Sequence, residues 1–381
     1  MISVYVHFPW CLQKCPYCDF ASSGIRRQDV PQEAYAEAVL AELGRRRAAL
    51  RDEGLASVFF GGGTPSLWEP AQLGRVLSAV RDSFADEAAT LEVTVECNPT
   101  SFDRERAEAL RAAGVNRLSL GIQSLHDQHL RFLGRLHNHA GALAALRDAC
   151  AVMERVSGDL MFGMPGQSAA QAAAEAGRLA DEGLDHLSAY SLTIEPETQF
   201  GALNRKGRLQ LAPEEETASA FESIRHALAE RGFEHYEVSN YARPGEHSVH
   251  NLHYWQGGAY LGLGAGAVGC LHTAPGRARR YRNDPRPERY LETSAADEVE
   301  VFEEALAGED LVREQLMLGL RTRWGMDLDR ARALSGVDPL AGREAAVEAA
   351  VGRGDAVVEE GALRVPGRHW LRLDSIVAEL F

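Results

Sequence analysis

Lysine is nearly absent from this chain, positive charge is in deficit, and no long apolar run occurs. Lys14 and Lys206 are the only lysines among 381 residues, and the net charge at neutral pH is −15. Nucleic-acid surfaces depend on clustered Lys and Arg, so this charge argues against nucleic acid as a partner. No apolar run approaches the roughly 20 residues that cross a bilayer. We expect a soluble protein with one large and one small domain.

The sequence also lacks a fourth cysteine beside the three near its start. Cys11, Cys15 and Cys18 follow the alternating run Ser3–Phe8, which predicts a strand. Three thiolates on a four-iron, four-sulfur cluster leave one iron free to bind a small molecule. We therefore expect such a cluster, with the chemistry at its open iron.

Zinc is the alternative to this cluster. Structural zinc needs four closed ligands, and the nearest fourth candidate, His7, lies on the predicted strand. A disulfide is disfavoured because no signal peptide is evident and the cysteines begin a few residues after Met1, so we expect a reducing cytoplasm. The remaining cysteines are scattered singly and are interpreted as core residues: Cys97, Cys150 and Cys270.

The first half of the chain alternates short β-rich runs with longer amphipathic ones. The predicted strands are Ser3–Phe8, Ser57–Phe60, Leu91–Glu96, Arg117–Leu120, Asp159–Phe162 and His186–Ser191. The predicted helices are Pro31–Leu50, Pro70–Ser83, Arg104–Ala113, Ala140–Val156 and Ala169–Asp181. Six such units predict an α/β fold with a parallel sheet, closed as a barrel or a partial barrel, and place the chemistry at the carboxyl ends of the strands.

The alternation of predicted strands and helices ends after a further predicted helix at Pro213–Arg231. We expect a core domain over residues 1–235, a connector rich in Gly, Pro, His and Tyr over 236–300, and a small domain over 301–381. The small domain is expected to be α/β and winged-helix-like. Its expected elements are three helices, a hairpin and a closing apolar segment, at Leu311–Arg323, Leu328–Leu334, Gly342–Arg353, Ala356–Val365 and Trp370–Phe381.

Unusual residues stand where the predicted strands end. The run Gly61-Gly-Gly-Thr-Pro-Ser66 follows the second strand, and glycines allow a ligand to approach the backbone closely. Glu96 ends the third strand, Gln123 lies just beyond Leu120 at the end of the fourth, and the fifth carries Asp159. Each alone is typical of a turn or a solvated cap. Together, beside a three-thiolate loop, they predict a ligand site.

These motifs resemble those of the radical S-adenosylmethionine (radical SAM) superfamily. Within it, the chain is similar over nearly its full length to the oxygen-independent coproporphyrinogen III oxidase group, and in particular to its haem chaperone branch, HemW. The resemblance rests on Tyr5-Val-His-Phe-Pro-Trp-Cys-x3-Cys-Pro-Tyr-Cys-Asp-Phe20, Leu120-Gly-Ile-Gln-Ser124 and His250-Asn-Leu-His-Tyr-Trp255. It implies a partial (β/α)6 barrel and a HemN-type C-terminal domain over 301–381.

The resemblance also implies roles for individual residues. Cys11, Cys15 and Cys18 would hold the cluster, whose open iron SAM would chelate before reductive cleavage. Arg135 is suited to pair with the SAM carboxylate. The residues matching SAM-site positions of the family are Tyr5, Gly62, Gly63, Thr64, Glu96, Gln123, Arg135 and Asp159.

Two functions remain open within this group: oxidative decarboxylation of coproporphyrinogen III, and haem carriage. The oxidase has a fourth cysteine where this chain has Phe20, and a longer N-terminal lead. The motif at His250 matches the one proposed for haem binding in the chaperones, with His247 and His253 as competing ligands. Carriage implies haem, an acceptor such as a membrane-associated respiratory protein, and an electron donor for the cluster. A homodimer is left open.

Overall fold

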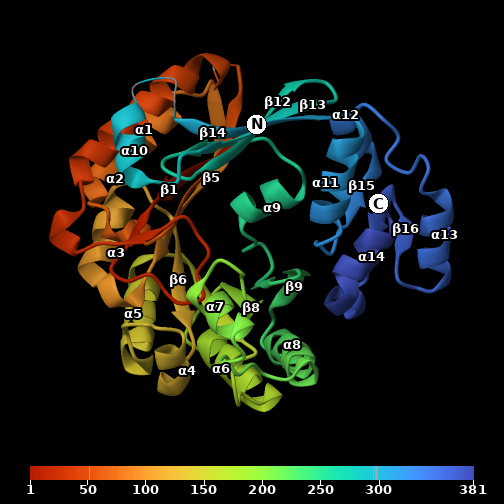
Figure 1. Ribbon diagram of the computed structural model, residues 1–381, viewed down its shortest axis with the longest axis horizontal. Helices are drawn as coiled ribbons and strands as arrows, with labels where there is room; N and C mark the ends of the chain where they lie inside the picture. Colours follow the sequence, from red (N-terminus) through yellow and green to blue (C-terminus); the bar gives the residue numbers. More distant parts are fainter. Residues whose placement is uncertain (51, 295, 297–298) are drawn as a thin grey trace.

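The protein is described by a computed structural model that covers residues 1–50, 52–294, 296 and 299–381, and is dominated by one twelve-stranded sheet (Figure 1). Seven neighbouring strands are parallel: β11 (Tyr260–Leu263), β1 (Ile2–Phe8), β4 (Gly54–Gly62), β5 (Asp86–Cys97), β6 (Arg117–Gln123), β7 (Arg155–Phe162) and β8 (His186–Ser191). Antiparallel strands extend both edges: β12 (Val268–Ala274), β13 (Arg277–Asn283) and β14 (Glu300–Ala307) beyond β11, and β10 (Asn240–Ala242) and β9 (Glu234–Glu237) beyond β8. The sheet is open, as expected for a partial barrel.

Alternation along the parallel strands separates an apolar face from a polar one. Successive side chains of a strand point to opposite faces. In β1, Val4 and Val6 belong to the main apolar core, whereas Tyr5 and His7 line a cavity. The neighbouring strands repeat this pattern and contribute polar cavity-lining residues: Glu96, Arg117, Ser119, Asp159, His186 and Ser188. The inner face of the sheet is therefore the polar one.

Helices cover the outer, apolar face of the sheet. They are α1 (Gln32–Arg46), α2 (Pro70–Arg81), α3 (Arg104–Ala112), α5 (His139–Val152), α6 (Ala169–Asp181), α8 (Glu214–Ala229) and α10 (Pro287–Thr293). Figure 1 shows α9 (Val249–Trp255) on the opposite, inner side. The short helices α4 (Asp127–Phe132) and α7 (Gln199–Arg205) pack on each other through Phe132 and Phe200, and Phe200 also contacts Tyr17 of the cysteine loop. Short segments complete the domain: β2 (Trp10–Cys11), β3 (Ser23–Gly24), and the 3-10 turns η1 (Arg27–Asp29), η2 (Arg47–Leu50), η3 (Pro65–Leu67) and η4 (Pro99–Ser101).

The predicted helix over Ala140–Val156 was wrong at its carboxyl end. Helix α5 ends at Val152, Met153 is extended, and β7 begins at Arg155. The apolar residues of the helix continue directly into the strand with no Gly or Pro between them. Periodicity alone therefore could not locate this boundary.

The segment expected to be a connector is part of the sheet. Residues 236–300 include β10 to β13, and β9 and β14 lie across its two ends. The hydrogen-bonded sheet continues through residues 235 and 300. The expected domain boundaries at these two residues therefore stay predictions.

The C-terminal segment forms a small α/β unit. Its elements are α11 (Glu309–Gly319), β15 (Met326–Asp327), α12 (Leu328–Ser335), α13 (Glu344–Gly352), β16 (Val357–Glu359), β17 (Ala362–Arg364), η5 (Gly367–Arg372) and α14 (Leu373–Glu379). Its sheet has the order β15-β17-β16, which agrees with the expected winged-helix arrangement. Among the helices of the described residues, none has both the length and the apolar character of a membrane span.

Candidate functional site

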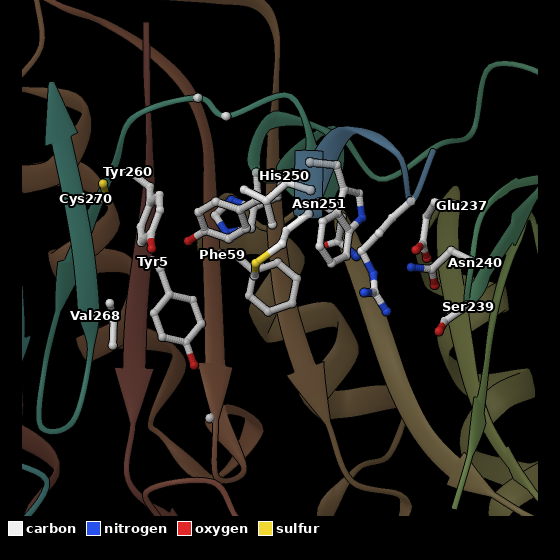
Figure 2. Close-up of a pocket in the computed structure, with 18 of the residues that line it drawn as sticks. Tyr5, Phe59, Glu237, Ser239, Asn240, His250, Asn251, Tyr260, Val268 and Cys270 are labelled. Atoms are coloured by element: carbon white, nitrogen blue, oxygen red, sulfur yellow. The ribbon is translucent and has the colours of Figure 1, made fainter. Parts of the chain in front are cut away.

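A cavity of about 1070 Å³ lies on the inner face of the sheet (Figure 2). Its walls come from the parallel strands, α9, β11 and β12, and from α11 of the C-terminal unit. Ligand pockets are typically ~300–1,000 Å³ in volume. This cavity is thus at the upper end of that range.

The cysteine loop begins at β2 and brings three thiols close together. Burial raises the pKa of the Cys11 thiol, and the neighbouring Cys15 raises it further. Burial likewise raises the pKa of Cys18, with Cys11 and Cys15 contributing. Arg135 Nη1 donates to Cys15 Sγ at 3.6 Å. Soft thiols beside a guanidinium form a donor set that fits an iron–sulfur cluster.

In the part of the chain that the structure describes, no group of three or more His, Cys, Asp or Glu side chains is arranged to hold a single metal ion.

The glycine motif braces the cysteine loop. Gly63 N–H donates to the Phe8 carbonyl at 2.7 Å, and Thr64 N–H donates to the Trp10 carbonyl at 2.8 Å. A Cβ atom on Gly63 would lie 2.5 Å from the Trp10 oxygen. The motif therefore has a structural role in addition to its predicted contact with SAM.

Gly62 couples this motif to Glu96. Its φ is +107°, and a Cβ atom there would collide with the His7 ring at 2.5 Å. Its N–H donates to Glu96 Oε2 at 3.0 Å. Glycine at this position thus lets the backbone pass close to the His7 ring, and the Gly62 N–H fixes the carboxyl group of Glu96 by a hydrogen bond.

Glu96 and Asp159 form a half-buried pair of carboxyl groups in the cavity wall. Burial, and then the charge of Asp159, raise the pKa of Glu96 to about 8. Burial also raises the pKa of Asp159, against hydrogen bonds from serines that include Ser119 Oγ at 3.1 Å. Two neighbouring carboxyl groups with raised pKa values are suited to receive a cationic group.

Arg135 and Gln123 lie beside this pair but not in the cavity wall. Arg135 Nη2 donates to the Gly121 carbonyl at 2.8 Å, while its buried Nε has no hydrogen-bond partner. Gln123 has a φ of +68°, which is strained for a residue with a side chain. An unpartnered guanidinium nitrogen beside the cysteine loop fits an anionic ligand at that place.

The structure divides the predicted residues among three locations. Those that line the cavity are Tyr5, Gly62, Glu96, Asp159 and His250. Those that line a small adjacent crevice are Cys15, Thr64 and Arg135. Those that line neither are Cys11, Cys18, Gly63 and Gln123.

His250 is held rigidly at the amino end of α9. Its N–H donates to Glu92 Oε1 at 3.0 Å, and its Nδ1 lies 2.8 Å from Ser57 Oγ. The Phe59 ring stacks on it with 4.9 Å between centroids, and Tyr254 packs edge-on at 4.7 Å. Burial lowers the pKa of His250 to about 3, so the imidazole is neutral. Its Nε2 is buried without a partner, and the residue lines the cavity (Figure 2).

The competing histidines are placed differently. His253 Nε2 hydrogen-bonds the Ala259 carbonyl at 2.8 Å. His247 packs against Tyr236 and Trp324. Within the described residues, neither histidine is part of the cavity wall. His250 is thus the histidine of the motif whose free ring nitrogen can meet a ligand in the cavity.

Sequence reasoning missed several polar residues of the cavity wall. Glu237 Oε1 and Asn240 Oδ1 are buried without partners, and Arg117 and His186 also line the cavity. The signal for the last two was present in the sequence, because they occupy alternate positions of otherwise apolar strands. No such signal marks Glu237 and Asn240, which end and begin two very short strands.

Comparisons with known proteins agree with this arrangement. The family model described as "Radical SAM superfamily" matches residues 5–176, and the one described as "HemN C-terminal domain" matches 306–371. The chain is 36% identical over 300 residues to "Heme chaperone HemW" of Haemophilus influenzae, covering 76% of each protein. It is 36% identical over 381 residues to the Mycobacterium tuberculosis protein of the same name, covering 99% of this chain and 94% of the relative.

A solved structure shares the fold across the whole chain. The coproporphyrinogen III oxidase HemN of Escherichia coli, described as a radical SAM enzyme, superposes with a TM-score of 0.82. The match covers 100% of this chain and 89% of the oxidase, at 21% identity. At that identity the likeness establishes the architecture and not the activity.

Proposed function

The chain belongs to the HemW family of the radical SAM superfamily, and from that membership we propose that it binds a four-iron, four-sulfur cluster, SAM and haem, and transfers the haem to an acceptor protein. The proposal has two parts: one concerns the cysteine loop, the adjacent crevice and the cavity wall beside them, and the other concerns the cavity wall at His250.

The first part concerns the cluster and SAM. Cys11, Cys15 and Cys18 would hold the cluster, which when bound supplies the electron for reductive SAM cleavage. Arg135 would pair with the carboxylate of SAM through its free Nε. Glu96 and Asp159 would face the cationic part of SAM, which would lower their raised pKa values. The other predicted SAM contacts are Tyr5, Gly62, Gly63, Thr64 and Gln123.

The second part concerns haem, and it rests on one observation. His250 lines the cavity, and its Nε2 is buried without a hydrogen-bond partner. A neutral imidazole with a free ring nitrogen is a common axial ligand of haem iron. Phe59, Tyr254 and Tyr260 add aromatic surface to the same wall, which suits a flat apolar macrocycle.

The structure also shows where Phe20 lies. This residue, at the position where the resemblance implies a fourth cysteine in the oxidase, is 57% exposed and lines the cavity. A phenyl ring can neither ligate iron nor exchange protons at that position. This substitution supports haem carriage over coproporphyrinogen oxidation.

The test offers both ligands separately to anaerobically reconstituted protein. We expect stoichiometric haem binding, and no protoporphyrinogen from coproporphyrinogen III even with SAM and a strong reductant. Sustained decarboxylation of coproporphyrinogen III by the pure protein would contradict the chaperone proposal.

We propose a respiratory haem protein as the acceptor and the cytoplasm as the location. Pull-down of haem-loaded protein against haem-free respiratory subunits tests the acceptor.

A further inference from the structure

Two histidines that line this cavity are each paired with a buried serine. Ser57 Oγ of β4 lies 2.8 Å from Nδ1 of His250, and Ser157 Oγ of β7 lies 2.7 Å from Nδ1 of His186. All four side chains are at most 2% exposed. Both histidines line the cavity, so the two pairs occupy similar surroundings.

The pairs differ at the second ring nitrogen. His186 Nε2 hydrogen-bonds the Tyr236 hydroxyl at 2.8 Å, so both of its nitrogens are satisfied within the protein. His250 Nε2 has no partner. Buried polar groups are nearly always satisfied, and an exception calls for an explanation such as an absent ligand. The contrast marks the His250 pair as the open one.

The hydrogen bonds of Ser57 can determine which ring nitrogen of His250 is protonated. Its Oγ also lies 2.8 Å from Ser3 Oγ, on the neighbouring strand β1, where Ser3 and Ser57 are paired in register. A serine hydroxyl can donate one hydrogen bond and accept others. When the Ser57 hydroxyl donates its hydrogen bond to Ser3 Oγ, its oxygen can accept a hydrogen bond from Nδ1–H of His250. The proton of the imidazole then stays on Nδ1, and Nε2 has a lone pair.

We propose that Ser57, supported by Ser3, is a positioning residue for haem: its Oγ accepts a hydrogen bond from the Nδ1–H of His250 and thereby leaves the Nε2 lone pair for the iron. The inference rests on the proposed haem function. Histidine ligands of metals usually donate their other ring N–H to a fixed acceptor, which sets the tautomer and the ring orientation. Here the acceptor is a buried hydroxyl on the strand next to β1.

The first experiment compares Ser57→Ala with the matched control Ser157→Ala. Loss of such a supporting partner typically weakens metal affinity by ~10- to 100-fold. We expect Ser57→Ala to weaken haem binding by about 10-fold and to change the ligand-field bands of the ferric haem. Ser157→Ala should leave both unchanged. Ser57→Thr, which keeps a hydroxyl and suits a strand, should restore wild-type binding.

The second experiment asks whether Ser57 acts through His250. In a His250→Ala background, Ser57→Ala should cause no further loss of haem affinity, because the residue it positions is gone. Additive losses in the double variant would overturn the inference, as would an unaltered haem affinity and spectrum in Ser57→Ala.

The third experiment needs no haem. Nitrogen NMR of isotope-labelled histidines in the haem-free protein should show His250 protonated at Nδ1, with His250→Ala used for assignment. Ser57→Ala should lose this fixed tautomer. Protonation of His250 at Nε2 in the wild type would overturn the inference. Failure of wild-type protein to bind haem would instead overturn the proposed function, since the NMR result reports on the serine–histidine pair by itself.

Discussion

The two ends of the cavity are built from different chemistry. The cluster end comprises Tyr5, Gly62, Glu96 and Asp159, next to the cysteine loop, and has two carboxyl groups with raised pKa values. The histidine end comprises Phe59, His250, Tyr254, Trp255 and Tyr260, and offers aromatic rings with one neutral imidazole. One end suits a small, charged ligand and the other a flat, largely apolar one.

A row of rings joins the two ends. Tyr5 stacks on Phe59 with 6.2 Å between ring centroids, and Phe59 stacks on His250 at 4.9 Å (Figure 2). The ends are therefore neighbours in one cavity, although their proposed ligands bind through different residues. Variants that affect one end and spare the other test this separation.

The largest expected effect is loss of the cluster in Cys15→Ala. Removing one of three thiolates leaves too few ligands, and iron and sulfide should be absent after anaerobic reconstitution. Haem affinity should stay near the wild-type value, because the histidine end has no cysteine ligand of the cluster. Full zinc occupancy with no uptake of iron by the wild type would count against the cluster.

Gly63→Ala should damage the cluster end nearly as strongly. Its Cβ atom would lie 2.5 Å from the Trp10 oxygen, so the backbone leading into Cys11 must move. Iron content and SAM binding should both fall. Gly44→Ala is the control, because its Cβ atom would have no neighbour within 4 Å. Full iron loading of Gly63→Ala would show that the glycine motif does not brace the cysteine loop.

A smaller effect is expected from Arg135→Ala. Hydrogen bonds to charged groups contribute about 1.5–3 kcal/mol, so SAM affinity should fall by ~10- to 100-fold. Iron content and haem affinity should be retained. The exposed Arg147→Ala serves as the control, and calorimetric SAM titration is the measurement. Unchanged SAM affinity in Arg135→Ala would place the SAM carboxylate elsewhere.

The smallest effect is a pH dependence of SAM binding. Glu96 has a pKa of about 8, so it is largely protonated at neutral pH. A cationic ligand favours the ionised form, so binding releases a proton. Affinity should therefore rise as the pH increases from 7, level off above the pKa of about 8, and gain about tenfold in total by pH 9. Glu96→Gln should flatten this profile. An equal slope in Glu96→Gln would assign the dependence to another group, such as Asp159.

The two ends also differ in how far the sequence predicts them. The cysteine loop and the glycine motif are each one short, continuous stretch of sequence. The residue spacing within each stretch is therefore enough to indicate the cluster end. The predicted strand at His186–Ser191 and the helix at Ala169–Asp181 match the structure at both boundaries. Local patterns suffice here, because the apolar periodicity is bounded by turn residues on each side.

The histidine end could not be assembled from local patterns. His250 is joined to Ser57 across a long stretch of chain, and only the parallel sheet brings α9 onto β4. Strands β9 and β10 are too short to show a period; β10 pairs with the edge of β8, and β9 pairs in turn with β10. The sequence motif indicates His250 as a candidate ligand, but the residues that contact His250 can be identified only from the tertiary structure.

The most direct test of the separation between the two ends identifies the axial ligand of the bound haem. Haem would be loaded into Cys15→Ala protein, which lacks the cluster, with isotope-labelled histidine, and the ferric iron examined by electron–nuclear double resonance. We predict a histidine nitrogen coupling that persists when His186 is also changed to Ala and disappears when His250 is changed to Ala. The account would be contradicted if the histidine nitrogen coupling remained in the His250→Ala protein. It would also be contradicted if the Cys15→Ala parent showed no such coupling.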